Sequence, residues 1–216
     1  MSKQSVCSGP LASLFGRHAR SICFRKRQLI FGVGARSDAA FWIEHGGVKL
    51  TQTSYHGREA VISILKMGDF FGCEVFDQSC PPRFVNAVAL TDVRLARVDR
   101  ALILSTIKSQ PSVCLQVISL LTALISELQL GVANNLSCSS DERLARALLS
   151  MSEMKLDSGT AHALRVSQQE LADMIGTTRQ RVNAILQRFK KMGLIDYSQG
   201  LHMYDSLRSI ARAIDL

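Results

Sequence analysis

Several signals that define other classes of protein are missing from this sequence. Its first ten residues, Met1 to Pro10, contain one lysine and no apolar segment, so no secretory signal is expected there and the protein is predicted to be cytoplasmic. Its six cysteines include no C-x-x-C pair, which argues against a structural zinc site. Cytoplasmic conditions would keep these thiols reduced. Internal repeats and low-complexity tracts are also lacking, so an ordinary folded chain is expected.

Features that would indicate an enzyme or a membrane protein are equally scarce. We find no paired carboxylates, no nucleophile beside a base, no metal-ligand spacing and no phosphate-binding glycine loop, so no catalytic or metal-binding residue is assigned. The stretch from Ser109 to Ser126 is uncharged over eighteen residues, at the short limit for a membrane span. It carries Gln110, Gln116 and several hydroxyls, which makes a span the less favoured reading.

The composition that is present fits a two-domain globular protein with an anionic partner. A length of 216 residues permits two compact domains, and 47% hydrophobic with 20% charged residues is typical of folded proteins. The net charge of +8 attracts polyanions such as nucleic acid or anionic membranes. Charge alone does not choose between these partners.

The first half of the chain is predicted to be a β-barrel or roll. Short apolar runs alternate with turn residues such as Gly46-Gly47 and Gly68-Asp69, at the regular spacing of an all-β domain. The predicted strands are 29–31, 40–43, 48–50, 60–65 and 93–98. Before them, Leu11 to Phe24 is interpreted as one or two turns of helix that lead into a sheet.

Beyond Asp99 the pattern becomes helical as far as about Asn135. One apolar row has the spacing of a helix-packing seam and is assigned to a dimer interface: Val117, Leu121, Leu124 and Leu128. A second apolar row follows another face: Leu115, Ile118, Ile125 and Val132. A helix apolar on two sides needs two partners, and its own β-domain plus the same helix of a second subunit would supply them. A fully buried helix of a monomer is the alternative, and residues 134–141 are predicted to form a hinge.

The segment from Val166 to Ile195 predicts a helix-turn-helix. Ser167 and Glu170 have the spacing of a capping box, Gly176 permits a tight turn, and a second helix is expected to begin at Thr177 or Thr178. Residues 193–204 have the pattern of a two-stranded wing, and Asp205 is expected to cap a final helix.

The second helix of this motif has the features of a DNA recognition helix. Arg179, Gln180, Arg181 and Asn183 are predicted to face outward near its N-terminal end, where they could reach base edges in the major groove. Between Met174 and Ile195 there are five basic residues and no acidic one, which suits phosphate contacts. A small helical bundle with a solvated basic face is the alternative. The residues expected to bind DNA are Ser167, Gln168, Thr177, Thr178, Arg179, Gln180, Arg181, Asn183, Arg188 and Lys190.

Taken in order, these segments resemble the Crp/Fnr family of bacterial transcription factors. The resemblance covers nearly the whole chain and rests on Phe41-Trp42-Ile43, Gly47-Val48-Lys49-Leu50, Gly68-Asp69-Phe70-Phe71-Gly72, Arg143-Leu144-Ala145, the helix-turn-helix and Gly193-Leu194-Ile195. It implies an α+β fold: an N-terminal sensory β-roll of the cyclic-nucleotide-binding, jelly-roll type over 1–110, a dimerisation helix and hinge over 111–138, and a winged helix-turn-helix over 139–216.

The resemblance also implies partners and residue roles. The family binds two-fold symmetric operators as homodimers, with recognition helices about 34 Å apart, and often contacts RNA polymerase. Arg179 is then expected to read guanine and Thr178 to touch a phosphate, while Gln180 replaces a glutamate of many relatives. Ala184 stands where the cyclic-AMP receptor has a further basic reader, so a different half-site is expected, with Arg181 and Asn183 able to compensate.

The sensory half departs from the cyclic-AMP-binding pattern. The residues expected in the effector pocket are Gly72, Cys73, Glu74, Arg83, Phe84, Leu128 and Gln129. Relatives hold ribose with a glutamate directly after Phe-Gly, whereas here Cys73 intervenes and Glu74 comes one place late. Phe84 replaces the hydroxyl residue after the phosphate-binding arginine, so a hydrogen bond is lost and a bulky ring takes its place. Cyclic AMP is therefore disfavoured, and no cofactor is assigned.

Other sensors remain open at this point. Arg83 is interpreted either as an anion ligand or as a solvated or structurally paired arginine. Cys73 and Cys80 lie near Arg83, which could lower a thiol pKa and make a redox switch, although free cysteines are more often small buried hydrophobes. The cysteine cluster of the iron–sulfur branch is lacking, and the five histidines are too scattered for a haem pocket. Some relatives need no effector, and a nucleotide-binding protein acting on a protein partner is a further alternative.

Overall fold

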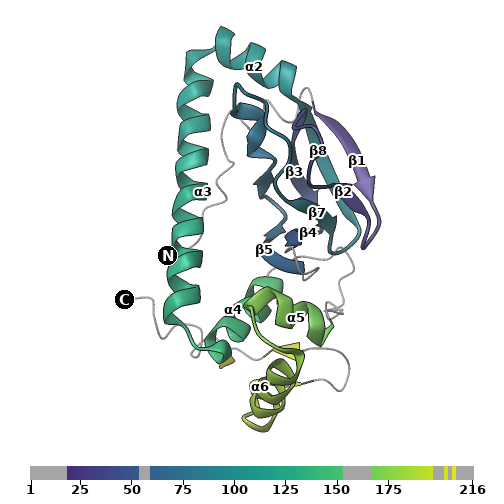
Figure 1. Ribbon diagram of the computed structural model, residues 1–216, viewed down its shortest axis with the longest axis vertical. Helices are drawn as coiled ribbons and strands as arrows, with labels where there is room; N and C mark the ends of the chain where they lie inside the picture. Colours follow the sequence, from purple (N-terminus) through teal and green to yellow (C-terminus); the bar gives the residue numbers. More distant parts are fainter. Residues whose placement is uncertain (1–18, 54–58, 153–166, 197–201, 204–205, 208–216) are drawn as a thin grey trace. The chain divides into compact units, whose positions relative to one another are not determined.

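The computed structural model describes residues 19–53, 59–152, 167–196, 202–203 and 206–207 (Figure 1). It divides into two compact units: an N-terminal unit that includes Ile62–Gln129 and the residues up to Gln52, and a C-terminal unit that includes Leu130 onward together with Thr53–Val61. The expected helical turns before residue 19, the turn at 198–200 and the cap at Asp205 lie outside the described residues.

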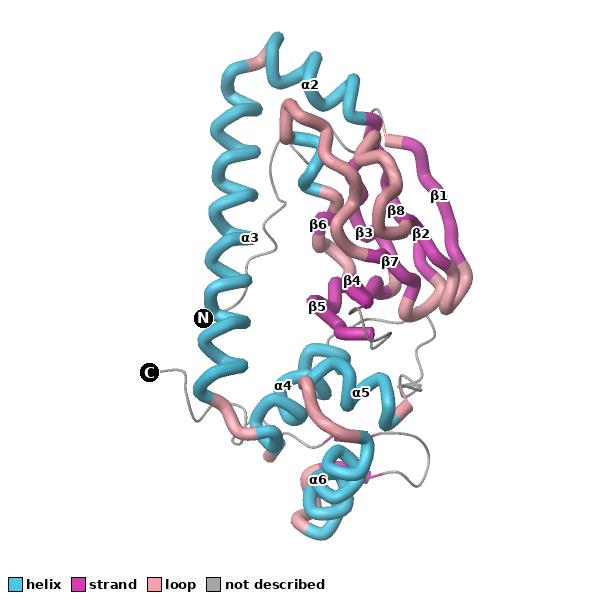
Figure 2. Tube along the Cα trace, in the orientation of Figure 1, coloured by secondary structure: helices cyan, strands magenta, loops and turns pink. Residues whose placement is uncertain are grey.

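The N-terminal unit contains two four-stranded antiparallel sheets, whose strands are drawn in magenta in Figure 2. The first sheet has the order β1 (Arg20–Phe24), β8 (Val93–Asp99), β3 (Ala39–His45) and β6 (Phe70–Phe71). The second has the order β2 (Leu29–Phe31), β7 (Asn86–Ala89), β4 (Gly47–Thr53) and β5 (Glu59–Lys66). All five predicted strands are confirmed, whereas β6 and β7 were not predicted.

Alternating side chains of β3 build the two cores of this unit. Ala39, Phe41 and Ile43 belong to a core that contains residues of both sheets. Ala40 and Trp42, one position out of step, pack instead among residues of α2 and α3. The period-two pattern of a strand that is covered on both faces therefore explains why β3 reads as a continuous apolar run.

The segment 11–24 was predicted to form one or two turns of helix leading into a sheet, and the part of it that the structure describes contains strand and no helix. Residues Arg20 to Phe24 form β1, which pairs along its whole length with β8, from Arg20 opposite Arg97 to Phe24 opposite Val93. Alternating exposed and half-buried side chains suit an edge strand, and pairing with β8 overrides the weak helical spacing.

The described part of this unit also contains three helical segments, of which the first lies between β6 and β7 and the other two follow β8. η1 (Cys73–Phe76) is a short 3-10 helix, α2 spans Arg100–Ser109, and α3 spans Pro111–Ser137. The predicted continuous helix is thus two helices, because Pro111 cannot continue the hydrogen bonds of α2. The predicted hinge begins at Cys138 rather than at 134, since α3 continues through Ser137.

The two apolar rows of α3 have roles opposite to those predicted. Val117 is 6% exposed, and Leu121 and Leu124 are partly buried with it against the β-roll. The other row is open to solvent, with exposed fractions of 53–69%: Leu115, Ile118, Ile125 and Val132. Leu128, from the first row, is 58% exposed and adjoins this open face. The assignment of Val117, Leu121 and Leu124 to the dimer seam is therefore wrong, because they cover their own domain.

By length and composition alone, α3 is long and apolar enough to cross a membrane. Pro111–Ala133 has a mean hydropathy of 1.8. Val113, Val117 and Leu120 are nevertheless buried against the β-roll, a contact that lipid-embedded residues could not make. The apolar composition is explained by one face that covers the roll and a second that is exposed.

Within its described residues, the C-terminal unit contains the helices α4, α5 and α6 and a small sheet. α4 spans Ser140–Ser152, α5 spans Gln168–Ile175, α6 spans Arg179–Lys191, and β9 (Ile195–Asp196) pairs with β10 (His202–Met203). Its core is contributed by all three helices and by β9, with Leu144, Leu148 and Phe189 essentially inaccessible to solvent. The predicted helix-turn-helix and wing strands are therefore confirmed.

Candidate nucleic-acid interface and sensory site

The helix-turn-helix is built by local hydrogen bonds that the sequence encodes directly. The Ser167 side chain accepts a hydrogen bond from Glu170 N, and the Glu170 carboxylate accepts one from Ser167 N, which completes the capping box. Gly176 ends α5 at φ 64°, a left-handed conformation that glycine adopts without strain. The Thr178 hydroxyl then accepts from Arg181 N and begins α6. Ser167 and Thr178 thus first serve as helix caps.

The buried face of α6 determines which side chains it exposes. Val182, Ile185, Leu186 and Phe189 are buried in the helical core. The remaining positions near the start of the helix are exposed: Arg179, Gln180, Arg181, Asn183 and Ala184. No acidic residue lies in the first turn of α6, so the helix presents two guanidinium groups and two amides without a carboxylate among them. This set of donors and acceptors matches base edges in the major groove.

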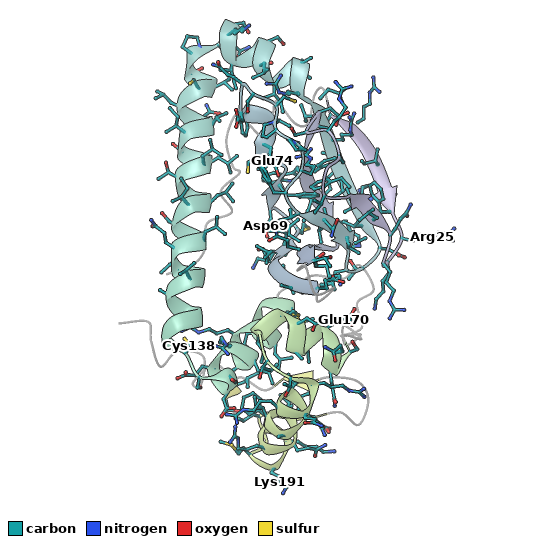
Figure 3. All side chains as sticks on the ribbon, viewed as in Figure 1. Arg25, Asp69, Glu74, Cys138, Glu170 and Lys191 are labelled. Carbon is teal, nitrogen blue, oxygen red and sulfur yellow. The ribbon has the colours of Figure 1, made fainter. Side chains whose placement is uncertain are left out.

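Two polar contacts link α6 to the other helices of its domain. Gln168 Nε2 donates to Asn183 Oδ1 at 3.3 Å, which ties the start of α5 to the exposed side of α6. Arg188 forms an ion pair with Asp141 at the start of α4, so this predicted DNA-contacting residue has a partner inside the domain. Lys190 is exposed in the last turn with Lys191, which extends outward in Figure 3. Cations in the last turn also offset the helix dipole.

A second capping box, which was not predicted from the sequence, lies at the start of α4. Ser139 N donates to the Glu142 carboxylate at 2.6 Å, and Glu142 N donates to the Ser139 hydroxyl at 3.3 Å. These hydrogen bonds hold the pKa of Glu142 below its ordinary value, the backbone contact being the larger cause. The signal is the same S-x-x-E spacing that identifies the start of α5.

In the N-terminal unit, Arg83 is the most buried charged side chain that the structure describes. It is 1% exposed, and its guanidinium carbon lies 4.3 Å from the centre of the Phe31 ring and 5.9 Å from that of Phe41. Its Nη1 donates to Glu74 Oε2 at 2.7 Å, and its Nη2 donates to the carbonyl oxygen of Ala39. The interpretation of Arg83 as a structurally paired arginine is therefore confirmed.

Gly72 provides the space for this arrangement. Its φ is 87°, and a Cβ added there would lie 2.9 Å from Arg83 Nη1 and 3.2 Å from the Ala39 carbonyl oxygen. Glu74 follows in η1, so the glycine turn brings its carboxylate to the guanidinium; Figure 3 labels Glu74 within this unit. The structure thus brings together Gly72, Glu74 and Arg83 from the predicted pocket.

Other predicted pocket residues lie elsewhere. Phe84 is 58% exposed, so its ring does not take the place of a phosphate beside Arg83, as the sequence had suggested. Leu128 and Gln129 are also exposed, on α3.

The alternative that Arg83 lowers the pKa of the Cys73 thiol is not borne out. Burial around the thiol raises the pKa of Cys73, the negative charge of Glu74 raises it further, and Arg83 lowers it by less than these raise it. The guanidinium charge is already compensated by Glu74. Cys73 and Cys80 are free thiols, and the Cys80 sulfur lies 3.6 Å from the Ser37 hydroxyl oxygen.

Fold and interface together define a class of protein: a DNA-binding regulator with a β-roll sensory domain and a winged helix-turn-helix. Two family models match the chain, a cyclic nucleotide-binding domain at residues 22–110 and a Crp-like helix-turn-helix domain at residues 142–208. The chain belongs to the Crp/Fnr family of transcriptional regulators.

Individual relatives support this assignment. A CRP-like cAMP-activated global transcriptional regulator of Mycobacterium tuberculosis is 27% identical over 197 residues, covering 89% of this chain and 86% of the relative. The cyclic AMP receptor protein of Thermus thermophilus is 27% identical over 172 residues, covering 79% and 77%. A crystal structure of a CRP-family transcriptional regulator from Thermus thermophilus matches with a TM-score of 0.74 at 20% identity, covering 89% of this chain and 97% of that one.

Proposed function

We propose that this chain is a homodimeric transcriptional regulator of the cytoplasm that binds a two-fold symmetric operator and does not require cyclic AMP. The observation that carries the DNA-binding part is the exposed start of α6. There Arg179, Gln180 and Arg181 project from a helix whose opposite side is packed into the domain core. A rigid helix that presents these side chains without a nearby carboxylate is suited to major-groove readout.

The exposed face of α3 supports the homodimer. Ile118, Ile125 and Val132 recur every seven residues and are 53–60% exposed. A seven-residue repeat of apolar side chains lets two helices pack along their length, and exposed β-branched residues would be removed from water by that contact. A two-fold dimer in turn requires a two-fold operator. Contact with RNA polymerase is expected from the family and is the further partner we propose.

Independence from cyclic AMP is supported by the sensory domain. The guanidinium of Arg83 is engaged by Glu74 and by the Ala39 carbonyl oxygen, with no ligand needed to compensate its charge. The competing candidate is a cyclic-nucleotide-responsive regulator, which is favoured by the printed description of the Mycobacterium relative as cAMP-activated.

The test is selection of random duplex DNA by the purified protein without ligand, followed by titration of the selected site with and without cyclic AMP. We expect a palindromic site whose affinity is unchanged by the nucleotide. A site bound only with cyclic AMP would establish the competing candidate. If Arg179→Ala left DNA affinity unchanged while Arg83→Ala abolished the regulatory effect in cells, a nucleotide-binding protein acting on a protein partner would replace the proposal.

A further inference from the structure

Arg83 carries a charge that is almost fully removed from water. Arg83 is 1% exposed, and Phe31 covers one face of its guanidinium at 4.3 Å. A buried cation is tolerated only when an anion and hydrogen-bond acceptors compensate for its lost hydration. The compensation of this charge therefore decides whether the sensory domain is stable.

Within the described residues, the compensating anion comes from the chain itself. Glu74 Oε2 lies 2.7 Å from Arg83 Nη1, and the glutamate side chain is only 14% exposed. The Ala39 carbonyl oxygen accepts from Nη2, while Nε has no hydrogen-bond partner in the described part of the chain. The guanidinium is thus held by one carboxylate and one carbonyl and has donor capacity left over.

The local backbone is arranged to deliver this carboxylate. Gly72 turns the chain at φ 87°, in a space that a Cβ would close, and η1 then begins at Cys73. Val75, the residue after Glu74, is fully buried in the core beneath α2 and α3 and anchors η1 against the roll. Arg83 is fixed from its own side, since its N–H donates to Ala35 O and its carbonyl oxygen accepts from Gly34 N.

We propose that Glu74 is an internal ligand of the sensory domain, whose carboxylate occupies Arg83 in place of an external anion. The wild-type domain accordingly binds no small carboxylate or phosphate at Arg83, and removing the carboxylate creates a site for one. This deepens the proposed function by giving a physical reason for independence from cyclic AMP, but the internal contact itself does not depend on DNA binding.

The experiment compares three full-length proteins: the wild type, Glu74→Ala, and the double variant Glu74→Leu with Arg83→Met. Thermal unfolding and isothermal titration are measured with acetate, inorganic phosphate and cyclic AMP, each against chloride at equal ionic strength. We expect the wild type to show no binding. The thermal midpoint of Glu74→Ala should be lowered in chloride and should rise by ~4 °C or more with saturating acetate or phosphate, because the anion binds only the folded state. The double variant, which has neither charge, should not respond.

Two results would overturn the proposal. One is binding of phosphate or cyclic AMP by the wild type that is lost in the double variant, since Arg83 would then be open to external anions. The other is a Glu74→Ala protein whose stability is indifferent to all three anions. Should Glu74→Ala fail to fold in chloride, its refolding yield in acetate against chloride becomes the measurement, and an equal yield in both contradicts the proposal.

Operator affinity is measured separately for the same three proteins. Anion binding and thermal midpoints report on Glu74 whether or not the protein binds DNA. A chain that shows the expected anion response but selects no DNA site would contradict the proposed function and leave the internal ligand intact.

Discussion

Arg83 and Arg179 have different roles because one is buried and the other is exposed. Arg83 is enclosed by Phe31, Glu74 and the Ala39 carbonyl oxygen, so its charge is used within the sensory domain. Arg179 is exposed in the first turn of α6, where the structure places no acidic residue. The first arginine holds a fold together, and the second is available to a partner.

Replacing Arg179 with alanine is expected to weaken specific DNA binding. A bidentate arginine–guanine contact is worth about 1–3 kcal/mol, so affinity for the selected operator should fall roughly 5- to 150-fold. Fluorescence anisotropy at fixed salt measures this. Arg20→Ala, an exposed arginine on β1, is the matched control and should change affinity little. Equal losses in both variants would mean that the effect is general electrostatic attraction rather than base readout.

At the scale of elements, the starts of α4 and α5 use the same device. Each helix begins with a serine and a glutamate three residues apart that satisfy each other's backbone N–H groups: Ser139 with Glu142, and Ser167 with Glu170. These boxes define where the helices begin, and hence how the buried residues of α4 and α5 align.

The box of α4 makes stability depend on acid pH. Because the pKa of Glu142 is lowered in the folded state, its contribution is complete above the unfolded glutamate pKa of about 4.3 and is lost as pH falls through the lower folded pKa. Urea midpoints of wild type and Glu142→Gln should therefore differ at pH 7 and converge as pH falls below about 4. A difference that stays constant down to acid pH would show that the carboxylate charge is not what stabilises the helix start.

Helix α3 allows a matched test of the proposed dimer face. Ile125 belongs to the seven-residue repeat, whereas Leu130 lies five positions on, about 140° around the helix, and is comparably exposed. We expect Ile125→Glu to convert a dimer to monomer in sedimentation velocity, because it places a charge where two apolar faces meet. Leu130→Glu should remain dimeric. Dissociation by both variants, or by neither, would contradict the assignment of this face.

At the scale of the whole molecule, two recognition helices should bind as one unit. A duplex with both half-sites engages two helices at once, whereas a duplex with one scrambled half-site engages one specifically. We expect the scrambled duplex to bind at least about tenfold more weakly, since the second contact is effectively intramolecular. Anisotropy titrations of the two duplexes at equal salt give the ratio. Equal affinities would indicate that the protein binds DNA as a monomer.

Much of the architecture could be predicted from sequence because it is determined locally. The capping box at Ser167, the turn at Gly176 and the apolar spacing of α6 depend on residues within a few positions of one another, so the helix-turn-helix could be recognised directly. Strands β3, β4, β5 and β8 were similarly visible as apolar runs between turns. β1 was not, because its structure depends on pairing with β8, which follows much later in the chain.

The sequence by itself determined the family, the two-part organisation and the outward face of the recognition helix, since these follow from local periodicity and ordered motifs. Only the tertiary structure decided which face of α3 covers the roll and which is exposed, because the sequence gives both apolar rows the same helical spacing. It also decided that Arg83 forms an ion pair with Glu74. That outcome depends on the turn at Gly72 and on Phe31 folding over the guanidinium, contacts between segments far apart in the chain.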